Sequence, residues 1–197
     1  MKYPSNQSDY SKYWDFIMDK IYTEFYDREN VTEEYILENF DLENYIDYKI
    51  FIHAICGYDN FGLNNVYCSI KNMNEGHKVM LTPWDLDMTW GYNWSGEYPT
   101  LLYEDSESIN KVDGLLTKSD NINNALKKRY FELRESVLSV DNICKIIDLC
   151  YQETKHPIKK DSEKWLETDL EVETNKVKDW YKKRVEFLDN YLGENNV

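Results

Sequence analysis

Residues Gly57–Gly91 read GYDNFGLNNVYCSIKNMNEGHKVMLTPWDLDMTWG, and this stretch holds most of the chemistry that the sequence offers. Asp59 and Asn64 open it with the spacing D-x-x-x-x-N, and Trp84-Asp85-Leu86-Asp87 comes near its end. Between them lie two short runs with β-strand character, 65–70 and 78–82, joined by a turn at 72–76. The stretch therefore predicts a small β-hairpin flanked by two acidic segments.

Helical patterns lie on both sides of this hairpin. The spacing of apolar residues predicts helices over 10–26, 32–40, 42–56, 121–137, 142–151, 159–167 and 170–192. We expect Gly57 to end the third of these helices in the left-handed conformation, and Pro157 to break the chain between two others. The second half of the 42–56 helix is apolar on most sides, which places it inside the domain as a rigid support for Asp59. The sequence predicts a mainly α fold with one small β-hairpin (α+β).

Length and charge limit the functional classes. The 197 residues fit one domain, or one lobe of a two-lobed protein. A net charge of −14 argues against a nucleic-acid partner and against docking on an anionic membrane. It does not exclude a nucleotide, because a divalent cation can invert the local sign of charge. No apolar run approaches the roughly 20 residues that span a membrane as a helix.

His53 and the four cysteines are better explained by packing than by chemistry. His53 lies in an apolar helix with no carboxylate three or four residues away, so we expect a buried histidine and not a catalytic base. The cysteines show no zinc-finger spacing, and we expect all four to be reduced core residues: Cys56, Cys68, Cys144 and Cys150.

Asp59 and Asn64 fit two roles that phosphoryl transfer requires. A carboxylate must accept or orient the proton of the attacking hydroxyl, and an amide oxygen nearby must help to hold a metal ion. The short spacing between the two residues lets both side chains face one centre. Asp and Asn are also ordinary turn residues, so this loop taken alone fits a plain turn as well.

Asp85 and Asp87 make the pattern more specific. They follow a short apolar strand, and two unpaired carboxylates at about 4 Å repel by roughly 1 kcal/mol in water and roughly 4 kcal/mol at an effective dielectric of 20. A divalent cation removes that repulsion, and carboxylate, amide and water are the ligands that Mg²⁺ or Mn²⁺ prefers. The alternative is a pair of turn or helix caps. Acid, amide, hairpin and acid is also the order in which kinase-type phosphotransferases build a catalytic loop and a metal site.

Three segments resemble a known family. They are NYIDY at 44–48, the pair Asp59 and Asn64, and PWDLDMTWG at 83–91. The last closely matches the signature PWDLD-x-T-[FW]-G, and together the segments resemble the spore coat protein H (CotH) kinase family. KYP at 2–4 looks like the start of that family's C-terminal lobe, and the residues around 161–165 and 184 resemble its closing helices.

The resemblance implies an atypical protein-kinase fold that transfers a phosphoryl group from ATP to protein side chains with Mg²⁺ or Mn²⁺. Asp59 looks like the catalytic-loop aspartate, and Asn64 looks like its metal-binding partner. Asp85 looks like the metal-binding aspartate at the start of the activation segment, and Asp87 is a possible second ligand. We prefer Asp85 as the principal ligand because it comes first after the strand. A spore or cell-surface location is also implied by the resemblance alone.

One departure from a complete kinase affects the domain assignment. The seven glycines include no G-x-G-x-x-G, and the lysines ahead of Asp59 lie on no convincing strand. We therefore expect residues 1–197 to form a single C-terminal lobe, with the catalytic loop and hairpin at 57–91 and helical packing at 10–56 and 121–192. The N-terminal lobe would then be a partner supplied by the longer protein, and this chain alone would be inactive. Two alternatives stay open: a non-catalytic structural or surface-assembly module of kinase-like shape, and a simple divalent-metal-binding domain.

Overall fold

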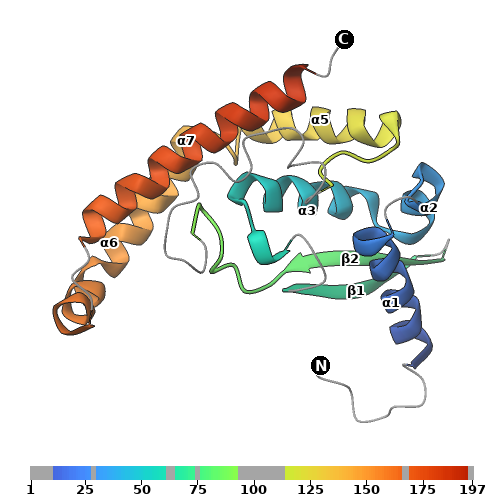
Figure 1. The fold of residues 1–197 in the computed structure, drawn as a ribbon, viewed down its shortest axis with the longest axis horizontal. Helices are drawn as coiled ribbons and strands as arrows, with labels where there is room; N and C mark the ends of the chain where they lie inside the picture. The colour runs from blue at the N-terminus through green and yellow to red at the C-terminus, as the bar shows by residue number, and fades with distance from the viewer. Residues whose placement is uncertain are drawn as a thin grey trace.

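The computed structural model of the chain describes residues 11–27, 30–60, 65–73, 76–92, 114–165 and 169–194 (Figure 1). It is mostly helical, with one two-stranded antiparallel sheet. In chain order the elements are α1 (Ser11–Tyr26), α2 (Glu33–Asn39), α3 (Leu42–Ile55), the 3-10 turn η3 (Tyr58–Asn60), β1 (Val66–Met73), β2 (Gly76–Pro83), α5 (Asp120–Arg134), α6 (Val140–Trp165) and α7 (Leu170–Glu194). The predicted α+β class with a single hairpin is confirmed.

Helix α3 is the centre of the domain, between the hairpin on one side and α5 and α7 on the other (Figure 1). Asp41 caps its start by accepting a hydrogen bond from the backbone N–H of Asn44 at 3.1 Å. Its buried residues lie all around the helix: Tyr45, Ile46, Tyr48, Ile50, Ile52, His53, Ala54 and Ile55. The predicted buried helix is confirmed, and with it a rigid base for the segment that follows.

The hairpin packs against α3 through strand β2. Val79 and Leu81 of β2 are buried, and Leu81 pairs with Cys68 in the β1–β2 register. The side chain of Asn44 reaches across from α3, accepting from the Leu81 N–H at 2.7 Å and donating to the Leu81 carbonyl at 3.0 Å. The free edge of β2 is therefore satisfied by a helix side chain at this residue.

Helix α6 runs without a break through Pro157, so the predicted break there is wrong. A proline inside a helix removes one hydrogen bond and commonly costs about 3 kcal/mol. Here Pro157 and Glu153, whose carbonyl loses its donor, are both exposed, so water can satisfy that carbonyl. Helix α6 also packs along α7, and the two form an arm that extends away from the hairpin (Figure 1).

The end of α3 differs from the expectation. Cys56, and not Gly57, takes the left-handed conformation, with φ of 51°, and its N–H bonds the His53 carbonyl. His53 itself is 2% exposed, as predicted. All four cysteines are free, but the prediction that all are core residues is wrong. Only Cys56 is buried, Cys68 and Cys144 are half-buried, and Cys150 is exposed. Over the described ranges, no helix has the length and apolar character needed to cross a membrane.

Candidate active site

The structure describes three of the four predicted site residues. Asp59 is half-buried in the 3-10 turn η3, directly after α3. Asp85 and Asp87 are exposed, and they follow the end of β2. Asn64 lies outside the described residues. Within the described part of the chain, no ion pair or side-chain hydrogen bond engages any of the three carboxylates.

A triangle of hydrogen bonds joins the segments that carry these residues. Asn60 donates from its side-chain Nδ2 to the carbonyl of Asn65 at 2.7 Å and to the carbonyl of Trp84 at 2.9 Å. The Trp84 N–H donates to the same Asn65 carbonyl at 2.9 Å. Asp59, Asn64 and Asp85 are the chain neighbours of Asn60, Asn65 and Trp84, in that order. The fold thus brings together the three segments that the sequence singles out, although up to 26 positions separate them.

Unusual backbone conformations gather in the same region. The non-glycine residues with positive φ among those described are Cys56 at 51°, Asn65 at 55°, Asp85 at 53° and Trp90 at 57°. All lie between the end of α3 and the end of the acidic segment. L-residues adopt this conformation at a cost, and such residues concentrate at ligand-binding and catalytic positions.

The far end of the acidic segment is anchored to both α3 and α7. The Trp90 N–H donates to the carbonyl of Ile55 at 2.8 Å, and the Trp90 ring lies 5.5 Å from the ring of Tyr181. Gly91 follows with φ of +87°, and a methyl group there would lie 2.7 Å from Cδ1 of Trp180. Only glycine fits this close approach, so segment 84–91 is fixed at both ends.

An exposed aromatic pair lies beside Asp85. Tyr67 on β1 and Trp84 are 56% and 55% exposed, and their ring centroids are 5.0 Å apart. Burial raises the pKa of the neighbouring Cys68 thiol to about 12, so this cysteine stays protonated and is a poor nucleophile at neutral pH. The exposed groups near the start of the acidic segment therefore include the Asp85 carboxylate and the rings of Tyr67 and Trp84.

The carboxylates of Asp85 and Asp87 are donors that suit a hard divalent cation whose other ligands are phosphate oxygens and water. Within the described ranges, no group of three His, Cys, Asp or Glu side chains is close enough to form a complete metal site. Mg²⁺ at nucleotide sites usually takes only one or two carboxylates, with phosphate oxygens and water completing its shell. Asp85 and Asp87 could supply that share, because no cationic side chain of the described residues neutralises them.

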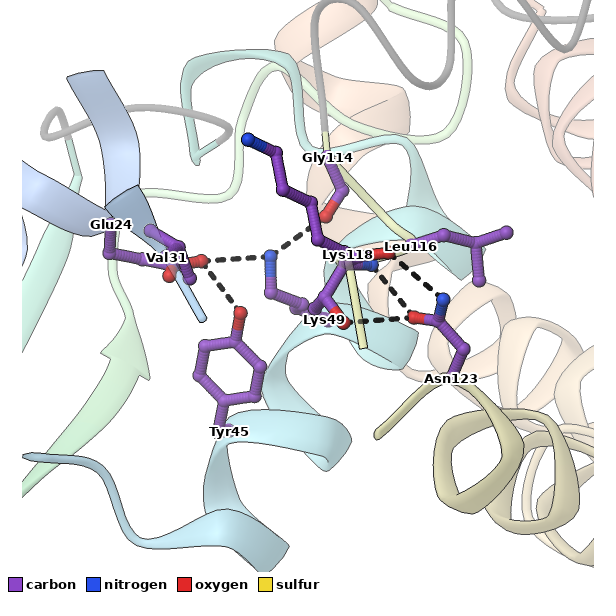
Figure 2. Close-up of a pocket in the computed structure, with 9 residues that line it drawn as sticks. Glu24, Val31, Tyr45, Lys49, Gly114, Leu116, Lys118 and Asn123 are labelled. Carbon is purple, nitrogen blue, oxygen red and sulfur yellow. Dashed lines mark hydrogen bonds and ion pairs between the residues drawn. The ribbon is translucent and has the colours of Figure 1, made fainter. Parts of the chain in front are cut away.

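A separate cavity of about 380 Å³ lies between α1, α3 and the loop that leads into α5 (Figure 2). Glu24, which is 3% exposed, accepts hydrogen bonds on Oε1 from the Tyr45 hydroxyl at 2.8 Å and from Lys49 Nζ at 2.9 Å. Lys49 also donates to the carbonyl of Gly114 at 2.8 Å. Figure 2 shows Lys49 lying between Glu24 and Gly114, so this charged pair links three parts of the chain.

Comparison with known families supplies the assignment. A family model described as CotH kinase protein matches residues 1–188. The chain belongs to the CotH kinase family. No curated protein matches it. Membership in the CotH kinase family confirms the resemblance read from the PWDLDMTWG segment, and it implies kinase-like chemistry with ATP and a divalent metal in general terms.

Two residues of this CotH kinase chain make contacts that the sequence does not predict. Asn60 follows Asp59 in a run of turn-forming residues, and nothing local predicts that its partner is Trp84. Gly91 ends the family signature, but its contact with Trp180 depends on a helix almost 90 positions later. No sequence signal indicates Asn60. Its burial, which the structure shows, does indicate a role, because a buried side-chain amide requires hydrogen-bond partners.

Proposed function

We propose that this chain forms the acceptor- and metal-binding side of an ATP-dependent protein kinase. Asp59 acts as the catalytic aspartate, Asn64 and Asp85 as metal ligands, and Asp87 as a second carboxylate for the metal. The observation that carries the proposal is the hydrogen-bond triangle of Asn60, Asn65 and Trp84, whose chain neighbours are the proposed residues. A turn built only for packing would not require these three segments to meet.

On this proposal, Asp59 orients the acceptor hydroxyl. The 3-10 turn that carries it is closed by the hydrogen bond from the Asn60 N–H to the Gly57 carbonyl at 2.9 Å, directly after the buried end of α3. A carboxylate on a short, fixed turn loses little freedom when substrate binds, which favours catalysis by positioning. Its role is to accept or orient the hydroxyl proton while the phosphoryl group is transferred.

We propose Asp85, and not Asp87, as the principal metal ligand. It directly follows Trp84, whose N–H and carbonyl are both bonded inside the triangle. Asp87 lies two residues further on, in a turn that Thr89 Oγ1 closes with a hydrogen bond to the Leu86 carbonyl at 2.6 Å. The exposed pair of Tyr67 and Trp84 adds an aromatic surface beside Asp85 on which a nucleotide base could stack.

We also propose that the lysine and loop that cover the ATP phosphates come from outside these 197 residues. The chain contains no G-x-G-x-x-G, and Lys49, the lysine nearest to Asp59 in the N-terminal part, is engaged by Glu24 and Gly114. On this proposal the isolated chain binds nucleotide weakly and transfers little phosphate. A rapid phosphoryl-transfer rate from the chain alone would contradict it.

Thermal protection by metal and nucleotide tests the proposed function. We expect Mn²⁺ together with a non-hydrolysable ATP analogue to raise the melting temperature more than Mn²⁺ alone, because a ligand stabilises by RT ln(1 + [L]/Kd). Asp85→Asn should abolish the additional shift. Asp15→Asn is the matched control, since Asp15 is an exposed carboxylate on α1, away from the triangle.

The possible results separate three functions. Additional protection by the nucleotide that depends on Asp85 supports the kinase. Equal protection with and without nucleotide would instead indicate a simple metal-binding domain. Absence of any protection would favour a structural module of kinase-like shape and would reject the proposed site.

A further inference from the structure

Asn60 has an environment that a turn residue does not need. It is 1% exposed, its N–H bonds the Gly57 carbonyl, and its own carbonyl accepts from the Tyr48 hydroxyl at 3.0 Å. Its side chain then donates to two carbonyls in different segments, those of Asn65 and Trp84. Backbone and side chain are therefore both fixed, and the side chain connects the Asp59 turn to the segment that carries Asp85.

The orientation of the Asn60 amide follows from its partners. The carbonyl oxygens of Asn65 and Trp84 can only accept, so the NH₂ group must face them and Oδ1 must face away. Oδ1 lies against Gly57, where an added methyl group would come within 3.0 Å of it. Gly57 has no positive φ, so its lack of a side chain serves this contact and not a turn.

Of the two carbonyls that Asn60 binds, one belongs to a left-handed residue and the other to the residue just before a left-handed one. Asn65 itself has φ of 55°, and the Trp84 carbonyl is part of the peptide group that leads into Asp85, where φ is 53°. The orientation of this peptide group depends on the backbone angles on either side of it. A donor that fixes the group therefore opposes relaxation of Asp85 to the right-handed or extended conformation, which would aim its carboxylate elsewhere.

We propose that Asn60 is a positioning residue: its side-chain NH₂ group fixes the Trp84–Asp85 peptide and so keeps Asp85 in the left-handed conformation beside the Asp59 turn. The consequence for metal binding rests on the proposed function, but the consequence for the Asp85 backbone does not. Asn60 itself touches neither metal nor substrate. It acts through Asp85, and it makes the positions of the two proposed site carboxylates depend on each other.

Two variants remove this contact in different ways. Asn60→Asp keeps the shape of the side chain but replaces the donor by an acceptor that faces two carbonyl oxygens. Gly57→Ala keeps every hydrogen-bonding group, but its added methyl group presses against Oδ1 of Asn60 and displaces the amide. Asn44→Asp is the matched control, because Asn44 also donates to a β2 carbonyl, that of Leu81, but lies away from the acidic segment.

The first readout is the backbone of Asp85 without any ligand. NMR of the labelled chain gives the sign of φ at Asp85 from its three-bond HN–Hα coupling and its Cα and Cβ chemical shifts. We expect positive φ in the wild type and in Asn44→Asp, and its loss in Asn60→Asp and Gly57→Ala. Retention of positive φ in both site variants would overturn the proposal.

The second readout is the dissociation constant of Mn²⁺ in the presence of a non-hydrolysable ATP analogue, measured where circular dichroism shows each variant folded. We expect about a tenfold weakening in Asn60→Asp, equivalent to about 1.4 kcal/mol, a smaller loss in Gly57→Ala and none in Asn44→Asp. Equal affinity in all four proteins would overturn the proposal. If the wild type binds no Mn²⁺, the proposed function fails, while the NMR result still decides the role of Asn60.

The wild-type chain provides a test that does not depend on whether the variants fold. The Asn60 side-chain NH₂ protons should exchange slowly with solvent, because both are bonded in a buried site. Rapid exchange of these protons in the folded protein would overturn the proposal.

Discussion

Two regions next to α3 differ in whether an acidic side chain is buried and paired with a cation. In the cavity between α1 and α3, Glu24 is buried and shares one oxygen between Tyr45 and Lys49. In the acidic segment after β2, Asp85 is exposed and meets no cation from the described residues, although its backbone is left-handed. The first carboxylate is paired with a lysine of the chain, and the second has no such partner in the part of the chain that the structure describes.

The difference separates a carboxylate that serves stability from one that, on the proposed function, serves a ligand. A buried charge must have a partner, and removing either member of a buried ion pair strongly destabilises the fold. An exposed carboxylate needs no partner, so the costly left-handed backbone of Asp85, which on our proposal Asn60 maintains, does not serve an ion pair among the described residues. On the proposed function, this conformation directs the Asp85 carboxylate toward a bound metal ion. Predictions that separate stability from ligand binding therefore test the comparison directly.

The largest effect is expected from Lys49→Met. This change leaves Glu24 as an uncompensated buried charge, which typically costs about 3–5 kcal/mol of unfolding free energy. Chemical denaturation followed by circular dichroism measures the loss. Adding Glu24→Gln should recover part of it, and Lys145→Met, at an exposed position of α6, should cost less than about 0.5 kcal/mol. A loss below 1 kcal/mol for Lys49→Met, on the order of a surface pair, would show that the Glu24–Lys49 pair is not a structural link.

Gly91→Ala should have the next largest effect. The added methyl group meets the Trp180 ring at 2.7 Å and requires an alanine at φ of +87°, and overpacking together with a left-handed L-residue costs roughly 2–4 kcal/mol. Because Gly91 anchors the acidic segment to α7, the variant should also lose protection by Mn²⁺ and nucleotide. Gly193→Ala is the control, since a methyl group there meets nothing within 4 Å. Unchanged stability of Gly91→Ala would mean that the segment is not anchored to α7.

Asp41 offers an intermediate case, a carboxylate that is partnered but near the surface. It caps α3 at Asn44 and pairs with Lys71 Nζ at 2.6 Å, and hydrogen bonding to Lys71 is the main cause that lowers its pKa. Asp41→Ala should cost about 1–2 kcal/mol. Because the folded pKa is lowered, this stability is present above the unfolded pKa of about 4 and is lost as pH falls through the folded value.

The measurement for Asp41 is the difference in unfolding free energy between wild type and Asp41→Ala at pH 6 and at about pH 3. The difference should shrink on acidification. It should fall only slightly in high salt, because Lys71 is half-exposed and its Coulombic share is already screened by water. A difference that stays constant with pH would show that the Asp41 carboxylate makes no contribution that depends on its charge.

The fold could be predicted from the sequence because its signals are local. Apolar residues along α3 and α7 and the two short β runs each indicate their own element. The break expected at Pro157 was wrong because an exposed helix can give up one hydrogen bond to water. The expected left-handed conformation of Gly57 was also wrong. Cys56 takes that conformation and ends the helix, and a glycine is needed at position 57 because the Asn60 side chain lies close to it.

The site could be predicted only in part, because its connections are not local. Asp59, Asp85 and Asp87 were predicted from residue type and spacing with the support of a family signature, and their roles stay predictions. The hydrogen bond from Asn60 to Trp84 spans 24 positions, and the contact of Gly91 with Trp180 spans 89. Neither partner carries a pattern that refers to the other. Asn64 lies outside the described residues, so its role stays a prediction.

The smallest effect on stability, and the sharpest test of the comparison, is expected from Asp85→Asn. Asparagine tolerates the left-handed conformation as well as aspartate does, and the lost carboxylate has no partner among the described residues. The unfolding free energy without ligand should therefore change by less than about 0.5 kcal/mol. Any change should be stabilising, because the variant removes one negative charge from a chain of net charge −14.

Asp41→Asn makes the same chemical change at a partnered carboxylate, and its effect should be destabilising because the Lys71 pair is lost. Chemical denaturation of the two variants side by side, in the presence of a chelator, measures the contrast. If Asp85→Asn destabilises the chain as much as Asp41→Asn, then the Asp85 carboxylate is satisfied inside the folded chain. Its left-handed backbone would then need no external ligand to explain it, and the distinction between the two regions would no longer hold.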